Sequence, residues 1–146
     1  MKMKIYLDNC TFNRPFDDQS QVRIRIETES KLYIQQKIKE KQLDLVWSYI
    51  LDYENEQNPY KERKEAISKW RRYAIIDIEE NERIIKKAKE LKEKGLRDKD
   101  ALHIACAIEG GAKYFITTDD TIIKRIGEYN NIHIINPTDF IREIED

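Results

Sequence analysis

Four acidic residues occupy positions where a catalytic or metal-binding carboxylate is expected. Asp8 ends a short apolar stretch, and Asp119 follows another, KYFITT. Glu54 and Asp100 lie in segments of helical pattern next to apolar runs. Gathered carboxylates repel one another unless a cation balances them, and oxygen-only ligands favour hard ions such as Mg²⁺ or Mn²⁺. Such ions support hydrolysis of phosphate esters. Taken singly, Asp8 and Asp119 are explained better as turn or helix caps.

Glu54 is informative because of its spacing from apolar residues. Ile50 lies four residues before it and Leu51 three before, so all three side chains share one side of a helix. Asp52 and Glu56 project elsewhere and can be solvated. A carboxylate on an inward stripe is unfavourable unless it is paired, protonated or bound to a cation. The structural alternative places Glu54 at the edge of the stripe, in contact with a lysine.

Asp100 also has both a structural and a functional explanation. It lies in the first turn of a helical pattern over residues 98–109, for which Asp98 is the expected N-cap. Acids in the first turn offset the helix dipole, so a purely structural role is available. Asp98 and Asp100 point to nearly opposite sides of the helix. Only one of them can face a shared cleft, and Asp100 directly precedes the apolar block.

Other side chains could contact metal or substrate. His103 lies one helical turn after Asp100 and could bind metal, but a packed, hydrogen-bonded histidine is the more common situation. Arg14 is a candidate contact for a substrate phosphate, because its planar fork suits that geometry, and Asn13 beside it is a candidate for the same role. The favoured alternative is an Arg14 that pairs with Asp17 or Asp18 and pins the loop.

The elements that must position these side chains alternate along the chain. Strands are predicted at residues 4–9, 44–48, 74–78, 113–118 and 132–135. Helices are predicted at residues 21–40, 49–57, 61–73, 80–94, 98–109 and 120–129, and a last one after Asn136 and Pro137. Residues 10–20 read as a polar loop in which Pro15 prevents regular structure. This alternation predicts an α/β fold with a five-stranded parallel sheet flanked by helices. Sites in such folds lie beyond the carboxyl ends of the strands.

Composition sets the broad class. A length of 146 residues suits a single domain spanning 1–146. With 27 basic and 28 acidic residues, the net charge of -1 does not indicate a nucleic-acid partner, so a local basic patch would have to meet one. Cys10 and Cys106 are too few for a disulfide scaffold. We find no apolar run of membrane-spanning length and no signal-peptide pattern, so a soluble, cytoplasmic protein without a membrane partner is expected.

The motifs LDN, WSYILDYEN, DALHIA and TTD, in this order, resemble the PIN-domain nucleases, which include VapC-type toxins. The resemblance covers essentially the whole chain and implies a three-layer PIN-like fold with an acidic, metal-dependent ribonuclease site. Carried over position by position, it makes catalytic and metal-binding residues of Asp8, Glu54, Asp100 and Asp119. Thr117 falls on the family's hydroxyl position near the metal. Asn9 stands where many relatives have Thr or Ser, as a second supporting residue.

The resemblance therefore predicts an endoribonuclease that uses Mg²⁺ or Mn²⁺ to hydrolyse single-stranded RNA. It also implies a homodimer and, for a toxin, an antitoxin protein as partner. The stretch NRPFDDQ replaces the apolar helix start of typical toxins and resembles a distinct branch of PIN proteins. One alternative is a catalytically inactive PIN-like module that binds RNA or protein. Another is a small nucleotide phosphohydrolase, since LDNCT resembles a phosphatase motif, although Cys10 stands where that motif has a second acid.

Overall fold

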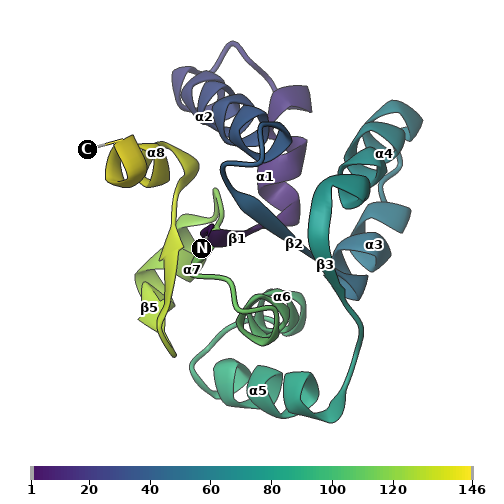
Figure 1. The fold of residues 1–146 in the computed structure, drawn as a ribbon, viewed down its shortest axis with the longest axis vertical. Helices are drawn as coiled ribbons and strands as arrows, with labels where there is room; N and C mark the ends of the chain where they lie inside the picture. The colour runs from purple at the N-terminus through teal and green to yellow at the C-terminus, as the bar shows by residue number, and fades with distance from the viewer. Residues whose placement is uncertain (1, 146) are drawn as a thin grey trace.

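The computed structural model describes residues 2–145 of the chain. A twisted sheet of six strands forms the middle of the molecule. The strands are β1 (Lys4–Leu7), β2 (Asp44–Ser48), β3 (Ala74–Ile78), β4 (Tyr114–Ile116), β5 (Glu128–Tyr129) and β6 (Ile132–Ile135). Their order across the sheet is β3-β2-β1-β4-β6-β5, and every pair is parallel except β5 with β6. Figure 1 shows the sheet between its helices.

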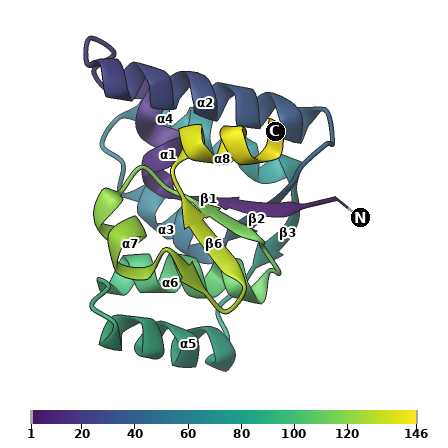
Figure 2. The ribbon, with the colours of Figure 1, turned by 90° about the vertical axis from the view of Figure 1, so that its left-hand side faces the viewer.

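Helices cover both faces of this sheet. They are α1 (Asn9–Asn13), α2 (Val22–Lys39), α3 (Tyr49–Glu56), α4 (Lys61–Ser68), α5 (Glu82–Glu93), α6 (Asp98–Glu109), α7 (Asp120–Ile126) and α8 (Pro137–Glu145), with 3₁₀ turns η1 (Arg14–Phe16) and η2 (Lys69–Tyr73). Figure 2 shows α2 and α8 on one side of the sheet and α6, backed by α5, on the other. The three-layer α/β fold predicted from the sequence is therefore confirmed.

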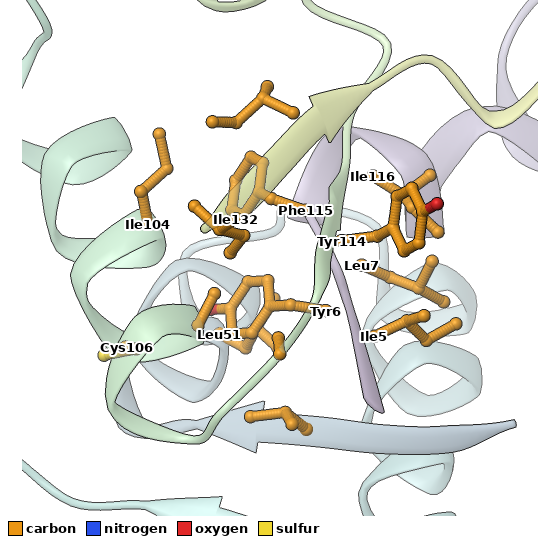
Figure 3. Close-up of a cluster of buried hydrophobic side chains, with 14 of the residues drawn as sticks. Ile5, Tyr6, Leu7, Leu51, Ile104, Cys106, Tyr114, Phe115, Ile116 and Ile132 are labelled. Atoms are coloured by element: carbon orange, nitrogen blue, oxygen red, sulfur yellow. The ribbon is translucent and has the colours of Figure 1, made fainter. Parts of the chain in front are cut away.

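The core follows from the alternation of side chains along the strands. Figure 3 shows Tyr6 and Phe115 on the side of α6, and Ile5 and Leu7 on the opposite side. The rings of Tyr6 and Phe115 stack with their centroids 5.4 Å apart. On the other face, the ring of Tyr114 meets Phe140 of α8 edge-on. Burial on both faces explains why the central strands are continuously apolar.

The order of the strands reverses beside β1. The chain builds β2 and β3 on one side of β1 and then crosses to build β4 and β6 on the other side. The carboxyl ends of β1 and β4 therefore diverge at a switch point, where helices leave in different directions and a site can form. Asp8 follows β1 there, and Thr117 follows β4.

The five predicted parallel strands are all present, and one edge carries in addition a sixth, antiparallel strand, β5. Asn130 and Asn131 have φ angles of 48° and 66°, and such a pair forms the two-residue turn that suits a hairpin. The helix expected over residues 120–129 accordingly ends at Ile126, before Gly127. A strand of two residues is too short to show the alternation of apolar and polar side chains by which strands are predicted.

The polar segment at residues 10–20 is more regular than predicted. Asp8 accepts a hydrogen bond from the backbone nitrogen of Asn9 at 2.8 Å and begins α1. Pro15 lies in the first turn of η1, where its missing N–H leaves no bond unmade. The helix predicted over residues 61–73 is likewise divided into α4 and the 3₁₀ turn η2. Within residues 2–145, no helix has both the length and the apolar character needed to cross a membrane.

Candidate active site

Thr117 joins two of the predicted acids at the switch point. Its Oγ1 donates a hydrogen bond to Oδ2 of Asp8 at 2.8 Å and accepts one from the backbone nitrogen of Asp119 at 3.1 Å. Thr117 is buried and Asp8 is nearly so. Asp119 caps α7 by accepting from the backbone nitrogen of Thr121 at 2.9 Å. The Thr117 hydroxyl thus links the carboxyl ends of β1 and β4, where Asp8 and Asp119 lie.

Cys10 is a further contact of Asp8 that the sequence did not indicate. Its Sγ donates to Oδ2 of Asp8 at 3.3 Å and lies 3.3 Å from Oγ1 of Thr117. Burial, followed by the negative charge of Asp8, raises the pKa of the Cys10 thiol to about 12. The thiol is therefore a protonated donor to the carboxylate. Cys106 is fully buried.

Glu54 projects from α3 toward the same place. Its Oε1 lies 2.5 Å from Nε2 of His103, and its Oε2 accepts from Nδ2 of Asn9 at 3.1 Å. Burial raises the pKa of Glu54, but the hydrogen bond and charge of His103, with smaller contributions from Lys99 and Asn9, outweigh it and lower the pKa overall. Glu54 is thus ionised and joins the helix α3 to both α1 and α6.

His103 connects this carboxylate to a buried chain of hydrogen bonds. Its Nδ1 lies 2.6 Å from the hydroxyl of Tyr6, which in turn lies 2.6 Å from Oγ of Ser48. Ser48 also caps α3, the helix that carries Glu54. Burial lowers the pKa of His103, but the hydrogen bond to Glu54 and the nearby carboxylates raise it overall. His103 is the hydrogen-bonded histidine that the sequence favoured, whereas the roles of Tyr6 and Ser48 were not foreseen.

Three of these side chains approach closely enough to share an ion. Asp8, Glu54 and His103 each offer one ligand atom, and these atoms lie within 4.8 Å of one another. Nε2 of His103 is 3.9 Å from Oδ1 of Asp8. His103, which the sequence offered as a possible metal contact, thus lies close to two of the four candidate acids.

Asp100 belongs to the same electrostatic cluster from the first turn of α6. Burial, followed by the charges of Asp8 and Asp119, raises its pKa to about 6. The prediction that Asp98 caps this helix was wrong. Arg97 occupies the cap position, and Asp98 lies in the first turn, 2.5 Å from Nζ of Lys92.

The four candidate acids differ from neighbouring acids in their partners. Within residues 2–145, no Lys or Arg lies within 4.0 Å of their carboxylates. Acids one or two positions away in the sequence are all neutralised by a cation, in the pairs Asp52–Arg71, Glu56–Lys64, Asp98–Lys92 and Asp120–Arg23. The sequence expectation that Asp98 and Asp100 face different ways agrees with this arrangement.

Asn13 and Arg14 lie at the end of α1 and the start of η1. Asn13 donates from Nδ2 to the carbonyl of Asn9 at 3.0 Å. Arg14 donates from Nη1 to Asp17 at 3.0 Å and from Nε to the buried Glu27 at 2.9 Å. The contact with Asp17 is the loop-pinning alternative favoured from the sequence. A contact of either residue with substrate stays a prediction.

The structure thus combines an α/β fold with a cluster of acids at the switch point of its sheet. The family model of the PIN domain matches residues 6–129. The chain therefore belongs to the PIN domain family, whose members are usually nucleases. A search of curated proteins finds no match.

Three solved structures are similar to this chain in fold. VapBC2 from Rickettsia felis, bound to a DNA fragment from their promoter, is 18% identical with a TM-score of 0.56, covering 92% of this chain and 98% of that chain. FitAcB from Neisseria gonorrhoeae is 12% identical with a TM-score of 0.58, covering 91% and 97%. VapBC-1 from nontypeable Haemophilus influenzae is 19% identical with a TM-score of 0.57, covering 93% and 99%. At these identities the likeness concerns the fold.

Proposed function

We propose that this chain is a metal-dependent endoribonuclease that hydrolyses phosphodiester bonds of single-stranded RNA. The observation that carries the proposal is the set of four candidate acids without a Lys or Arg partner, within residues 2–145, beside acids that all have one. Asp100 is half-buried and repelled by Asp8 and Asp119, which is unfavourable, and a divalent cation removes the repulsion. Membership of a family of nucleases supports the same conclusion.

The residues present fit a divalent cation. Asp100 has a pKa raised to about 6, which reflects burial and repulsion from Asp8 and Asp119. Oδ1 of Asn9 is buried and, among residues 2–145, has no hydrogen-bond partner, although the same amide donates to Glu54. A carbonyl oxygen and carboxylates together are the donors that Mg²⁺ and Mn²⁺ prefer. The four acids would hold such an ion.

When bound, the ion supplies positive charge to the phosphate and activates water for attack. The protein supplies the positioning. Thr117 and Cys10 orient the carboxylate of Asp8 through hydrogen bonds to Oδ2, which leaves Oδ1 toward His103. Asn9 and His103 each hold one oxygen of Glu54. Residues behind the ligands that fix them in this way commonly decide metal affinity.

The test is cleavage of single-stranded RNA in Mg²⁺ or Mn²⁺ by the natural chain and by matched variants. Asp8→Asn, Asp100→Asn and Asp119→Asn should each lower the cleavage rate by more than about 100-fold, since even partners behind the ligands contribute 10- to 100-fold. Asp98→Asn is the control, because Asp98 shares the first turn of α6 but pairs with Lys92. Its rate should be unchanged.

Three outcomes would contradict the proposal. Equal cleavage by the natural chain and the three site variants would trace the activity to a contaminant. Intact RNA in every metal would favour an inactive binding module, and hydrolysis of free nucleotides without cleavage of RNA would favour a small phosphohydrolase.

We also propose that the chain is the toxin of a toxin–antitoxin pair in the cytoplasm, with an antitoxin protein as partner and a homodimer as its own assembly. Support comes from the similar structures, which are named as VapBC and FitAcB complexes. Growth arrest on expression, relieved by co-expression of a gene adjacent to its own, would test the role. Size-exclusion chromatography with light scattering would test the dimer.

A further inference from the structure

The Tyr53 side chain lies exposed beside the candidate acids. It precedes Glu54 on α3, and 53% of its surface is exposed. Nζ of Lys99 lies 5.8 Å from the centre of the Tyr53 ring, within the range of a cation–π contact. Lys99 precedes Asp100 on α6. The pair therefore bridges the two helices that carry Glu54 and Asp100, at the edge of the acidic cluster.

Two cations at this edge have no ion-pair partner among residues 2–145. Lys99 donates to Oε1 of Gln57 at 3.3 Å, and within residues 2–145 neither Lys99 nor Arg97 has a carboxylate within 4.0 Å. Both are exposed, and both precede Asp100 at the start of α6, Arg97 as the N-cap and Lys99 in the first turn. The charge of Lys99 acts to lower the pKa of Glu54, and the charge of Arg97 acts to lower the pKa of Asp100. Among residues 2–145, both therefore lack an ion-pair partner at the place where an anion would approach the site.

The other exposed aromatic cluster near α3 is already occupied by internal contacts. Arg63 covers the rings of Tyr60 and Phe16, at 4.6 Å and 5.6 Å from their centres. Its guanidinium also pairs with Asp17 and donates to the carbonyl of Phe16. That cluster fastens η1 to α4. Tyr53 is different because Lys99, the cation beside its ring, has no carboxylate within 4.0 Å among residues 2–145.

We propose that Tyr53, Lys99 and Arg97 form a subsite for one nucleotide of single-stranded RNA, with a base stacked on Tyr53 and the adjacent phosphates held by the two cations. The inference rests on the proposed nuclease function and adds the surface that presents RNA to the acids. Unpaired bases stack readily on exposed aromatic rings, and basic side chains beside such rings follow the backbone.

The experiment measures binding of a fluorescent single-stranded RNA in EDTA, where cleavage does not interfere, and then KM and kcat in Mn²⁺. Tyr53→Ala should raise the dissociation constant about tenfold, equivalent to about 1.4 kcal/mol. Tyr53→Phe should bind like the natural chain, because the ring remains. Lys99→Gln and Arg97→Gln should each weaken binding and reduce the slope of log K against log salt by about 0.7. In Mn²⁺ the change should fall on KM rather than kcat.

Tyr33→Ala is the matched control. Tyr33 is also exposed, at 38%, with Nζ of Lys37 5.2 Å from its ring, but it lies on α2 and its hydroxyl binds Glu145 of α8. Binding by this variant should be unchanged. Normal RNA affinity in Tyr53→Ala would overturn the inference and favour a protein partner for this ring. Equal losses in Tyr53→Ala and Tyr33→Ala would overturn it as well.

The subsite and the nuclease function fail in different ways. If the natural chain binds RNA with the expected pattern among variants but cleaves none, the subsite stands and the nuclease function fails. If RNA is cleaved and Tyr53→Ala and Lys99→Gln both retain natural KM values, the function stands and the subsite fails.

Discussion

Lys31 is a buried base without a carboxylate partner within residues 2–145. It is only 4% exposed, and Nζ lies 5.6 Å from the centre of the Phe12 ring, a contact that offsets part of its desolvation. Glu27, one turn before it on α2, already accepts hydrogen bonds from Arg14, Arg23 and Asn136. Burial therefore lowers the pKa of Lys31 to about 7.

Lys31→Met should stabilise the chain at low pH. Between pH values of about 7 and 10.5 the unfolded chain holds a proton on Lys31 that the folded chain lacks. Stability of the natural chain therefore rises with pH across this window, and it is lowest below pH 7. At pH 6 the variant should gain about 2–4 kcal/mol in free energy of unfolding, and by about pH 10 the gain should vanish.

Urea unfolding at both pH values measures this difference. Lys86→Met, which changes an exposed lysine of α5, is the control and should give the same stability as the natural chain at each pH. A pH profile of Lys31→Met that parallels the natural profile would contradict the assignment.

At the scale of elements, one chain of buried hydrogen bonds ties β1 to β2, α3 and α6. Tyr6 of β1 contacts both Ser48 at the end of β2 and His103 of α6 through a single hydroxyl. The ring of Tyr6 packs separately, stacked on Phe115 and edge-on to His103. The polar and apolar contributions of this residue can therefore be separated by removing the hydroxyl alone.

Tyr6→Phe should lower the free energy of unfolding by about 1–3 kcal/mol, because it leaves buried His103 and Ser48 with one partner fewer while the ring stays in place. Tyr114→Phe on the neighbouring strand β4 is the matched control. Tyr114 is also buried, but its hydroxyl makes no hydrogen bond within residues 2–145. Thermal unfolding at pH 7 measures both, and equal effects of the two variants would show that the hydrogen-bond chain contributes nothing specific.

At the scale of the whole molecule, folding brings the charge of Asp100 toward those of Asp8 and Asp119. These acids come from α6 and from the segments after β1 and β4, so the folded chain brings their charges together and the unfolded chain separates them. An ion held by these acids binds the folded state only and shifts the unfolding equilibrium by mass action.

Mn²⁺ should therefore raise the melting temperature of the natural chain. At 100 times the dissociation constant the gain is about 2.7 kcal/mol, and each kcal/mol corresponds to about 2–4 °C in a chain of this size. Asp100→Asn should abolish the shift, yet stabilise the metal-free chain at pH 8, since it removes an unfavourable negative charge. Asp98→Asn should keep the shift. Differential scanning fluorimetry with and without EDTA measures all three, and a full Mn²⁺ shift in Asp100→Asn would contradict a shared ion.

Much of the architecture follows from local patterns. Apolar runs predicted the strands β1, β2, β3, β4 and β6, and helical periodicity predicted the helices between them. Together they predicted a sheet covered by helices on both faces. The misses were short elements. α1 begins because Asp8 caps it, and β5 exists because Asn130 and Asn131 turn the chain, so neither has a periodic pattern of its own.

The sequence by itself determined the kinds of side chain at the strand ends and the order of the elements, because capping, periodicity and alternation act over a few residues. Only the tertiary structure decided which acids have partners. Thr117 meets Asp8 across 109 positions and His103 meets Tyr6 across 97, while Asp98 turns to Lys92. Such contacts depend on how helices pack against the sheet, and a pattern that repeats every two or every 3.6 residues contains no information about distant partners.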